Sequence, residues 1–153
     1  MKTSAVPQIS VHDRQRKIQA DRAALEQFAL RALRLCLRQR ARGRGLAALE
    51  EIDVLLISDR RMSELHRKFM GISGPTDVIT FQHGEIFIST ETAKRQARRF
   101  RSSLEHELRL YLVHGLLHLA GFDDKTGKGA AEMSRVQEKL VDRVPRLRDH
   151  SMA

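Results

Sequence analysis

Residues 104–120 read LEHELRLYLVHGLLHLA, the most apolar stretch of helical pattern in the chain. Its leucines, with Tyr111 and Val113, cover most of the circumference of a helix. A helix that is apolar on nearly every side lies buried inside a protein. Gly121 follows directly and is well placed to end it. The sequence therefore predicts a central buried helix over Leu104–Ala120, with the other elements packed around it.

Two histidines, His114 and His118, interrupt this apolar helix four residues apart. Residues at this spacing share a helical face, so both imidazoles can point at one metal ion. Once Gly121 has turned the chain, Asp123 or Asp124 can return a carboxylate to the same point, and the spacing favours Asp124. The pattern His-x3-His-x5-Asp predicts a metal site of His114, His118 and Asp124 on the buried helix and the turn after it.

Three protein ligands leave a fourth position of zinc open to water, which is the catalytic arrangement. Such a zinc ion lowers the pKa of water to about 7 and polarises a phosphoryl oxygen. Imidazoles in so apolar a helix need partners, and Gly115 in mid-helix costs about 1 kcal/mol. Both features favour a functional site. The alternative is a pair of core histidines satisfied by hydrogen bonds.

Zinc metalloproteases carry a related helix, which reads His-Glu-x-x-His and uses the Glu as general base. In this chain Gly115 occupies the position of that Glu. The base is therefore missing, and peptide hydrolysis is disfavoured.

Shorter elements surround the central helix. Apolar patterns predict strands over 8–11, 51–58, 77–81 and 85–89, the last two joined by a hairpin turn at 82–84. Further helices are predicted from Asp21 to the Gly- and Arg-rich segment 41–45, over 59–69 with Met62, Leu65 and Phe69 on one side, over 90–101, and over 129–144 with Pro145 ending it. The fold class is α+β (mixed α/β), a small mostly mixed sheet of about four strands flanked by about five helices.

Length and composition set the broad class. The 153 residues are 41% hydrophobic and 31% charged, which is typical of one globular domain over residues 1–153. We expect a cytoplasmic protein, because no apolar run approaches the roughly 18–20 residues of a membrane span and no signal peptide is evident at the N-terminus. Cys36 is the one cysteine, which excludes an intramolecular disulfide, and its apolar surroundings indicate a small buried hydrophobe.

The charge is more informative. With 28 Lys and Arg against 19 Asp and Glu, the formal net charge is +9. This favours polyanionic partners, nucleic acid above all. The alternative is that the basic residues only keep the chain soluble.

Three ordered motifs resemble the YbeY endoribonucleases, also called rRNA maturation factors. The segment His114–Asp124, HGLLHLAGFDD, is similar to the signature of that family. Gly74–Phe81, GPTDVITF, resembles its Pro-Thr-Asp-Val-Leu-Ser-Phe element, and Gly84–Ile86 resembles its Gly-Asp-Ile strand. The likeness covers roughly residues 53–140, and the first fifty residues match only in general layout.

The resemblance implies a single-strand-specific, metal-dependent endoribonuclease for ribosomal RNA maturation and ribosome quality control. It implies one Zn²⁺ per chain, with His114 and His118 as catalytic residues, and partners among ribosomes or small-subunit assembly factors. We expect a monomer that does not bind membranes. Asp77 is a candidate substrate-side residue, which could orient a ligand or cap the turn after Pro75.

Two positions depart from the family pattern. The third ligand is most often histidine, whereas Asp124 stands here, and its charge should make the metal a weaker Lewis acid. The family commonly has Tyr-Arg where this chain has Phe69 and Met70. Methionine cannot donate to phosphate, so either the neighbouring Arg67 or Lys68 binds the substrate in its place, or the activity is reduced.

Met70 motivates a second hypothesis, an RNA- or ribosome-binding assembly factor with a structural zinc and reduced or absent nuclease activity. A third hypothesis is a zinc hydrolase of another small substrate, which a neutral cleft would favour. Metal content and RNA cleavage together distinguish the three.

Overall fold

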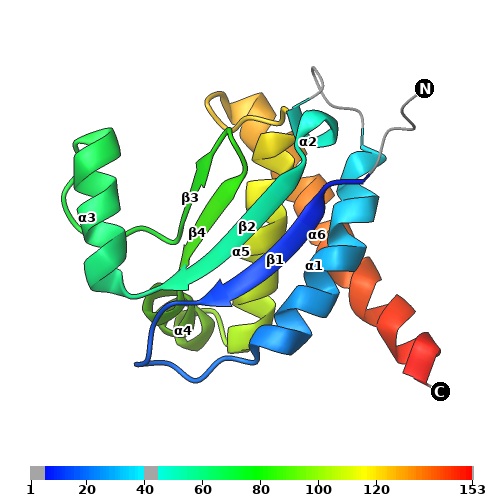
Figure 1. Ribbon diagram of the computed structural model, residues 1–153, viewed down its shortest axis with the longest axis horizontal. Coiled ribbons are helices and arrows are strands. Elements are labelled where there is room, and N and C mark those ends of the chain that lie inside the picture. The colour runs from blue at the N-terminus through cyan, green and yellow to red at the C-terminus, as the bar shows by residue number, and fades with distance from the viewer. Residues whose placement is uncertain (1–5, 40–44, 153) are drawn as a thin grey trace.

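The computed structural model describes residues 6–39 and 45–152, with side chains up to residue 144. The described part of the chain forms one sheet of four strands, which lie in the order β1-β2-β4-β3 (Figure 1). The strands are β1 (Gln8–Asp13), β2 (Glu51–Ile57), β3 (Val78–Phe81) and β4 (Glu85–Ser89). β1, β2 and β4 run parallel, and the edge strand β3 is antiparallel to β4. The hairpin predicted between the last two strands is confirmed.

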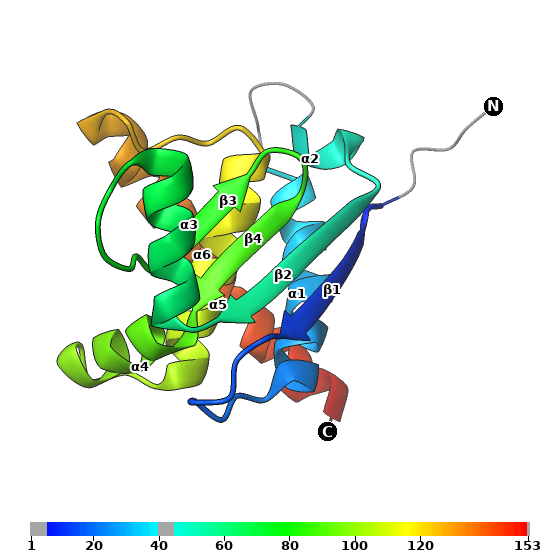
Figure 2. The same cartoon turned by 60° about the vertical axis from the view of Figure 1, so that its left-hand side comes forward.

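Helices cover the two faces of the sheet unequally. One face is covered by α1 (Arg22–Leu37) and α5 (Leu104–Leu119), and α6 (Gly127–Met152) packs on these two helices. α3 (Asp59–Met70) packs on the other face of the sheet beside β3 and β4 (Figure 2). The short α2 (Gly45–Ala48) precedes β2, and α4 (Thr90–Arg99) follows β4. The α+β class with a four-stranded mixed sheet is confirmed.

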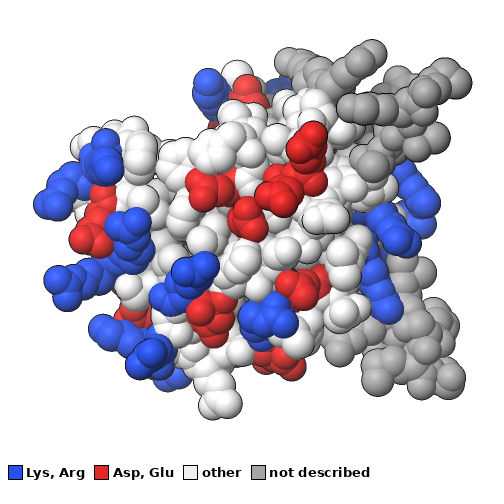
Figure 3. All heavy atoms as spheres, viewed as in Figure 1, with Lys and Arg blue, Asp and Glu red and all other residues white. Residues whose placement is uncertain are grey.

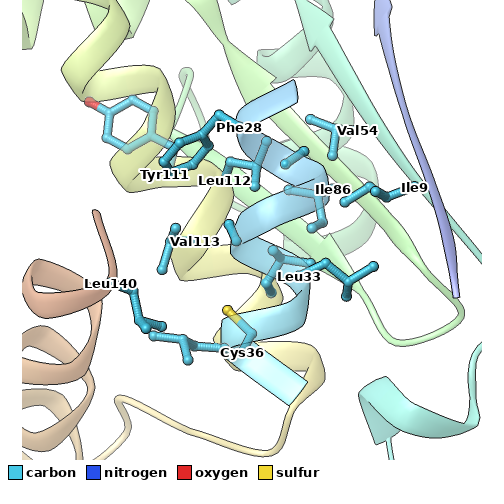
Figure 4. Close-up of a cluster of buried hydrophobic side chains, with 14 of the residues drawn as sticks. Ile9, Phe28, Leu33, Cys36, Val54, Ile86, Tyr111, Leu112, Val113 and Leu140 are labelled. Atoms are coloured by element: carbon cyan, nitrogen blue, oxygen red, sulfur yellow. The ribbon is translucent and has the colours of Figure 1, made fainter. Parts of the chain in front are cut away.

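The central position of α5 is also confirmed. Leu112, Leu116 and Leu117 are fully buried, and they belong to a core cluster shared by the sheet, α1, α5 and α6 (Figure 4). Cys36 lies in this cluster, and burial raises the pKa of its thiol to about 12. The sulfur therefore acts as a buried hydrophobe, as the sequence indicates.

A smaller core cluster holds α3 against the other face of the sheet. Met62 and Leu65 from α3 pack with Ile57 and Ile79 from the strands. Phe69, which the helical spacing places on the same side, is 54% exposed. The last turn of α3 thus carries an aromatic ring that the core does not cover.

The structure has six helices in its described part, in agreement with the prediction of about five. The additional one, α2, is a single turn too short to show a periodic pattern. One element prediction needs correction. α6 continues to Met152, so the prediction that Pro145 ends it is wrong. Proline inside a helix removes one hydrogen bond and crowds the carbonyl four residues before it, at a cost of about 3 kcal/mol, but its fixed φ of about −65° is helical, so a helix can continue past it. The segment 41–45, expected to end the first long helix, lies outside the described residues except for Gly45, and α1 already ends at Leu37.

Gly115 sets how closely α5 approaches the sheet. A Cβ at this position would lie 2.7 Å from Cγ2 and 2.9 Å from Cδ1 of Ile86 on β4. Real Cβ atoms do not come so close, so a larger residue would push the helix from the strand. The mid-helix glycine is therefore explained by packing.

Among the described residues, no helix combines the length and the apolar character needed to span a bilayer.

Candidate metal centre

The candidate ligands come from the end of α5 and from the loop that follows. His114 and His118 lie on the last two turns of the helix, which ends at Leu119. Gly121 has a φ of 102°, which is unfavourable for other residues, and its N–H donates to the His118 carbonyl at 3.1 Å. The chain then reverses and returns Asp124 beside the two imidazoles.

The three ligand atoms form a compact triangle. His114 Nε2 lies 3.1 Å from His118 Nε2, and Asp124 Oδ2 lies 3.7 Å and 3.8 Å from these two nitrogens. The corners of such a triangle are each about 2.1 Å from a common centre, which matches Zn–N and Zn–O bond lengths. The residues present therefore fit one zinc ion. The side chains are 26%, 26% and 47% exposed, so the site opens to solvent.

Gln137 on α6 orients the first of these imidazoles. Its Oε1 lies 2.8 Å from Nδ1 of His114. Because a carbonyl oxygen can only accept, Nδ1 carries the proton and Nε2 keeps a lone pair directed toward the other two ligands. Sequence reasoning missed this residue. The available signal was its position four residues after the buried Met133, where a polar side chain stands on the inner side of an amphipathic helix.

The surroundings of the second imidazole favour its neutral form. Burial lowers the pKa of His118 below its ordinary value, and the nearby His114 lowers it further because two imidazolium charges repel. The carboxylate of Asp124 acts in the opposite direction but does not outweigh them.

Among the described residues, the group that could hold a metal consists of His114, His118 and Asp124. Asp123 is not part of this group, and its Oδ1 accepts from the Lys125 N–H at 2.7 Å within its own loop. The structure brings together the three residues that the spacing favoured.

The candidate substrate residues lie apart from this group. Arg67, Lys68 and Met70 are exposed at the end of α3, and the Lys68 ammonium lies 5.3 Å from the centre of the Phe69 ring. Asp77 accepts from the Val78 N–H at 2.8 Å and from the Thr76 hydroxyl at 3.3 Å, which are the contacts of a turn cap.

The fold and this cluster define a small α+β protein with a candidate metal centre of two histidines and one aspartate. A family model described as Endoribonuclease YbeY matches residues 10–145. Among curated relatives, the Endoribonuclease YbeY of Moorella thermoacetica is 35% identical over 142 residues, which covers 80% of this chain and 90% of the relative. That of Thermotoga maritima is 37% identical over 100 residues, covering 61% and 67%. The chain belongs to the YbeY endoribonuclease family.

A solved structure supports the same assignment of the fold. The solution structure of a Thermotoga maritima protein superposes with a TM-score of 0.63 at 27% identity and covers 93% of each chain.

Proposed function

We propose that this chain is a zinc-dependent endoribonuclease that cuts single-stranded regions of ribosomal RNA. The observation that carries the proposal is the triangle of His114, His118 and Asp124, whose size fits one zinc ion. Membership of a family whose relatives are named endoribonucleases supports the choice of reaction. When bound there, zinc supplies Lewis acidity toward a phosphoryl oxygen and lowers the pKa of water.

The residues of the chain have distinct tasks in this proposal. His114 and His118 donate nitrogen lone pairs from a rigid buried helix, and Gln137 keeps the proton of His114 on Nδ1. Asp124 adds a negative charge, which holds the cation but reduces its pull on phosphate oxygens. Its position on a loop places that charge at the solvent-exposed side of the site.

We propose that basic residues bind the RNA substrate. Arg67 and Lys68 are exposed on α3 and would contact the RNA backbone, while Asp77 would hold the loop before β3 in shape. The net charge of +9 favours a polyanion over a neutral small substrate. We further propose that the chain acts as one monomeric domain in the cytoplasm, with ribosomes or small-subunit assembly factors as partners in rRNA maturation and quality control.

Metal content and RNA cleavage, measured on the same samples of wild type and Asp124→Ala, test the proposal. We expect about one zinc per chain in wild type, and loss of both metal and cleavage of a single-stranded RNA in Asp124→Ala. Asp123→Ala is the matched control, since that neighbour faces its own loop, and it should retain both. An Asp124→Ala chain with full metal content and full cleavage would exclude this carboxylate from the site.

The role of Gln137 gives a separate prediction. Gln137→Leu removes the acceptor for His114 Nδ1–H, and we expect the metal affinity to fall about ten- to a hundredfold. A competition titration with a chromophoric chelator measures the affinity. Gln137→Glu keeps an acceptor at the same place and should retain the metal. Equal affinities for wild type and Gln137→Leu would show that the hydrogen bond does not tune the ligand.

A second candidate function follows from Met70, which is 51% exposed and offers no donor to phosphate. An assembly factor that binds RNA without cutting it fits this residue. Wild type that carries zinc and binds RNA but does not cleave it would favour this function. Met70→Arg is then the first variant in which to look for cleavage.

A further inference from the structure

A groove lies between the last turns of α3 and the outer face of the β3–β4 hairpin. It has a volume of about 330 Å³, which is within the range of small-ligand sites. Leu65, Phe81 and Phe87 lie deeper in its lining, and the rim carries Lys68, Phe69 and His83. We call it the aromatic groove. It is on the face of the sheet opposite to α1 and α5.

The rings of the aromatic groove contact one another in a row. The centroid of Phe81 lies 5.1 Å from that of Phe69, edge to face, and 5.8 Å from that of His83, with planes only 21° apart. Phe87 forms a second edge-to-face pair with Phe81, with planes 89° apart. The two ends of this row are exposed rings: Phe69 is 54% exposed, and the side chain of His83 is 68% exposed.

Three of the exposed large apolar residues follow one another closely in the sequence here. Met70 and Ile72, just after Phe69 along the chain, are 51% and 50% exposed, although they do not line the groove themselves. Isolated exposed apolar residues need no explanation, but a group of neighbours next to a groove marks a binding surface.

The charges around the groove favour an anionic occupant. Arg60, Arg61, Arg67 and Lys68 are exposed on α3, and Figure 3 shows Lys and Arg gathered over this helix. The acidic residues of the lining have partners there. Glu64 lies 3.6 Å from Arg61, and Glu85 lies 2.7 Å from His83. Cations therefore stand beside the exposed ring of Phe69.

We propose that the aromatic groove stacks a nucleobase of single-stranded RNA, with Phe69 and His83 offering the ring faces and Lys68 contacting the adjacent phosphate. The choice of ligand rests on the proposed function. Every base has a π-face, so stacking binds without sequence preference. Bases inside a duplex are stacked on each other and cannot enter, so the groove would itself select single strands.

Binding of labelled oligoadenylate of about twelve nucleotides, read by fluorescence anisotropy, tests the stacking site. The full chain is used as purified, and the RNA is checked for intactness after each titration. We expect Phe69→Ala to weaken binding about five- to a hundredfold. Phe69→Tyr should keep the wild-type affinity, because it keeps the ring. An abasic oligomer of equal length should bind wild type and Phe69→Ala equally.

A matched control comes from Phe100 after α4. It is 65% exposed and has the guanidinium of Arg99 5.5 Å from its ring centre, yet it does not line the groove. Phe100→Ala should bind like wild type. Salt dependence separates stacking from charge, since Lys68→Gln should reduce the slope of log Kd against log salt by about one and Phe69→Ala should leave it unchanged.

Two results would overturn the stacking site. Unchanged oligoadenylate affinity in Phe69→Ala would show that the ring does not bind RNA, and the apolar rim would then be assigned to contact with a protein partner. An equal loss with the abasic oligomer would show that the ring does not contact bases. The proposed nuclease function is tested independently of the stacking site. Wild type that binds RNA through Phe69 but does not cleave it would contradict the nuclease function and support the stacking site. Wild-type cleavage and RNA binding that are both unchanged in Phe69→Ala would support the nuclease function and contradict the stacking site.

Discussion

His118→Ala is expected to lose the bound metal and to cut RNA at least about a hundredfold more slowly than wild type. Residues that merely orient a ligand already contribute ten- to a hundredfold to metal affinity or activity, and this change removes a ligand outright. Only His114 and Asp124 remain, and Asp124 is nearly half exposed on a loop. Elemental analysis and a cleavage assay on the same samples measure the effect.

The control for this loss lies on the same helix. His106 is exposed near the start of α5 and is not part of the metal cluster, so His106→Ala should keep its metal and its activity. Binding of oligoadenylate should survive in His118→Ala, because the aromatic groove does not include that residue. A His118→Ala chain with one metal per chain and wild-type cleavage would refute the metal centre.

Gly115→Ala is expected to lower the free energy of unfolding by about 1–3 kcal/mol. Replacing glycine by alanine within a helix ordinarily stabilises it by about 1 kcal/mol. Here the new methyl group would meet two carbon atoms of Ile86 at less than 3.0 Å. Overpacking therefore outweighs the gain in helix propensity. Denaturant unfolding followed by circular dichroism gives the difference.

Two further variants isolate the contact. Gly127→Ala, at the start of α6, places a methyl group where nothing lies within 4 Å, and it should not be destabilised to a comparable extent. Ile86→Ala makes room beside Gly115, so adding Gly115→Ala to it should cost less than in wild type. Wild-type stability of the single variant Gly115→Ala would show that α5 can shift freely from the sheet.

The metal cluster was predictable because its geometry is local. A helix brings residues four apart to one face, and a glycine after the helix returns the next carboxylate. Gln137 was not predictable in the same way, since its contact with His114 depends on how α6 docks on α5. Helical spacing alone gives no docking angle.

Periodicity also gives the direction of a side chain but not whether another element covers it. Met62, Leu65 and Phe69 follow one stripe of α3, and the first two are buried as expected. Phe69 forms an edge-to-face pair with Phe81 and has Lys68 beside its ring, yet it is still 54% exposed. Gly115 shows the converse case. The low helix propensity of glycine at this position suggested a functional reason for it, whereas its close packing against Ile86 on β4 provides a structural reason.

α6 is synthesised after the other elements that form the candidate site. All three candidate ligands, and every strand of the sheet, precede α6 along the chain. α6 alone supplies Gln137, and it also supplies Met133 and Leu140 to the main core. A chain that ended before α6 would have the three candidate ligands but would lack the hydrogen bond from Gln137 and part of the hydrophobic core. Chains that terminate before α6 are therefore expected to be inert toward RNA, so nuclease action would begin only once α6 has been synthesised and has docked.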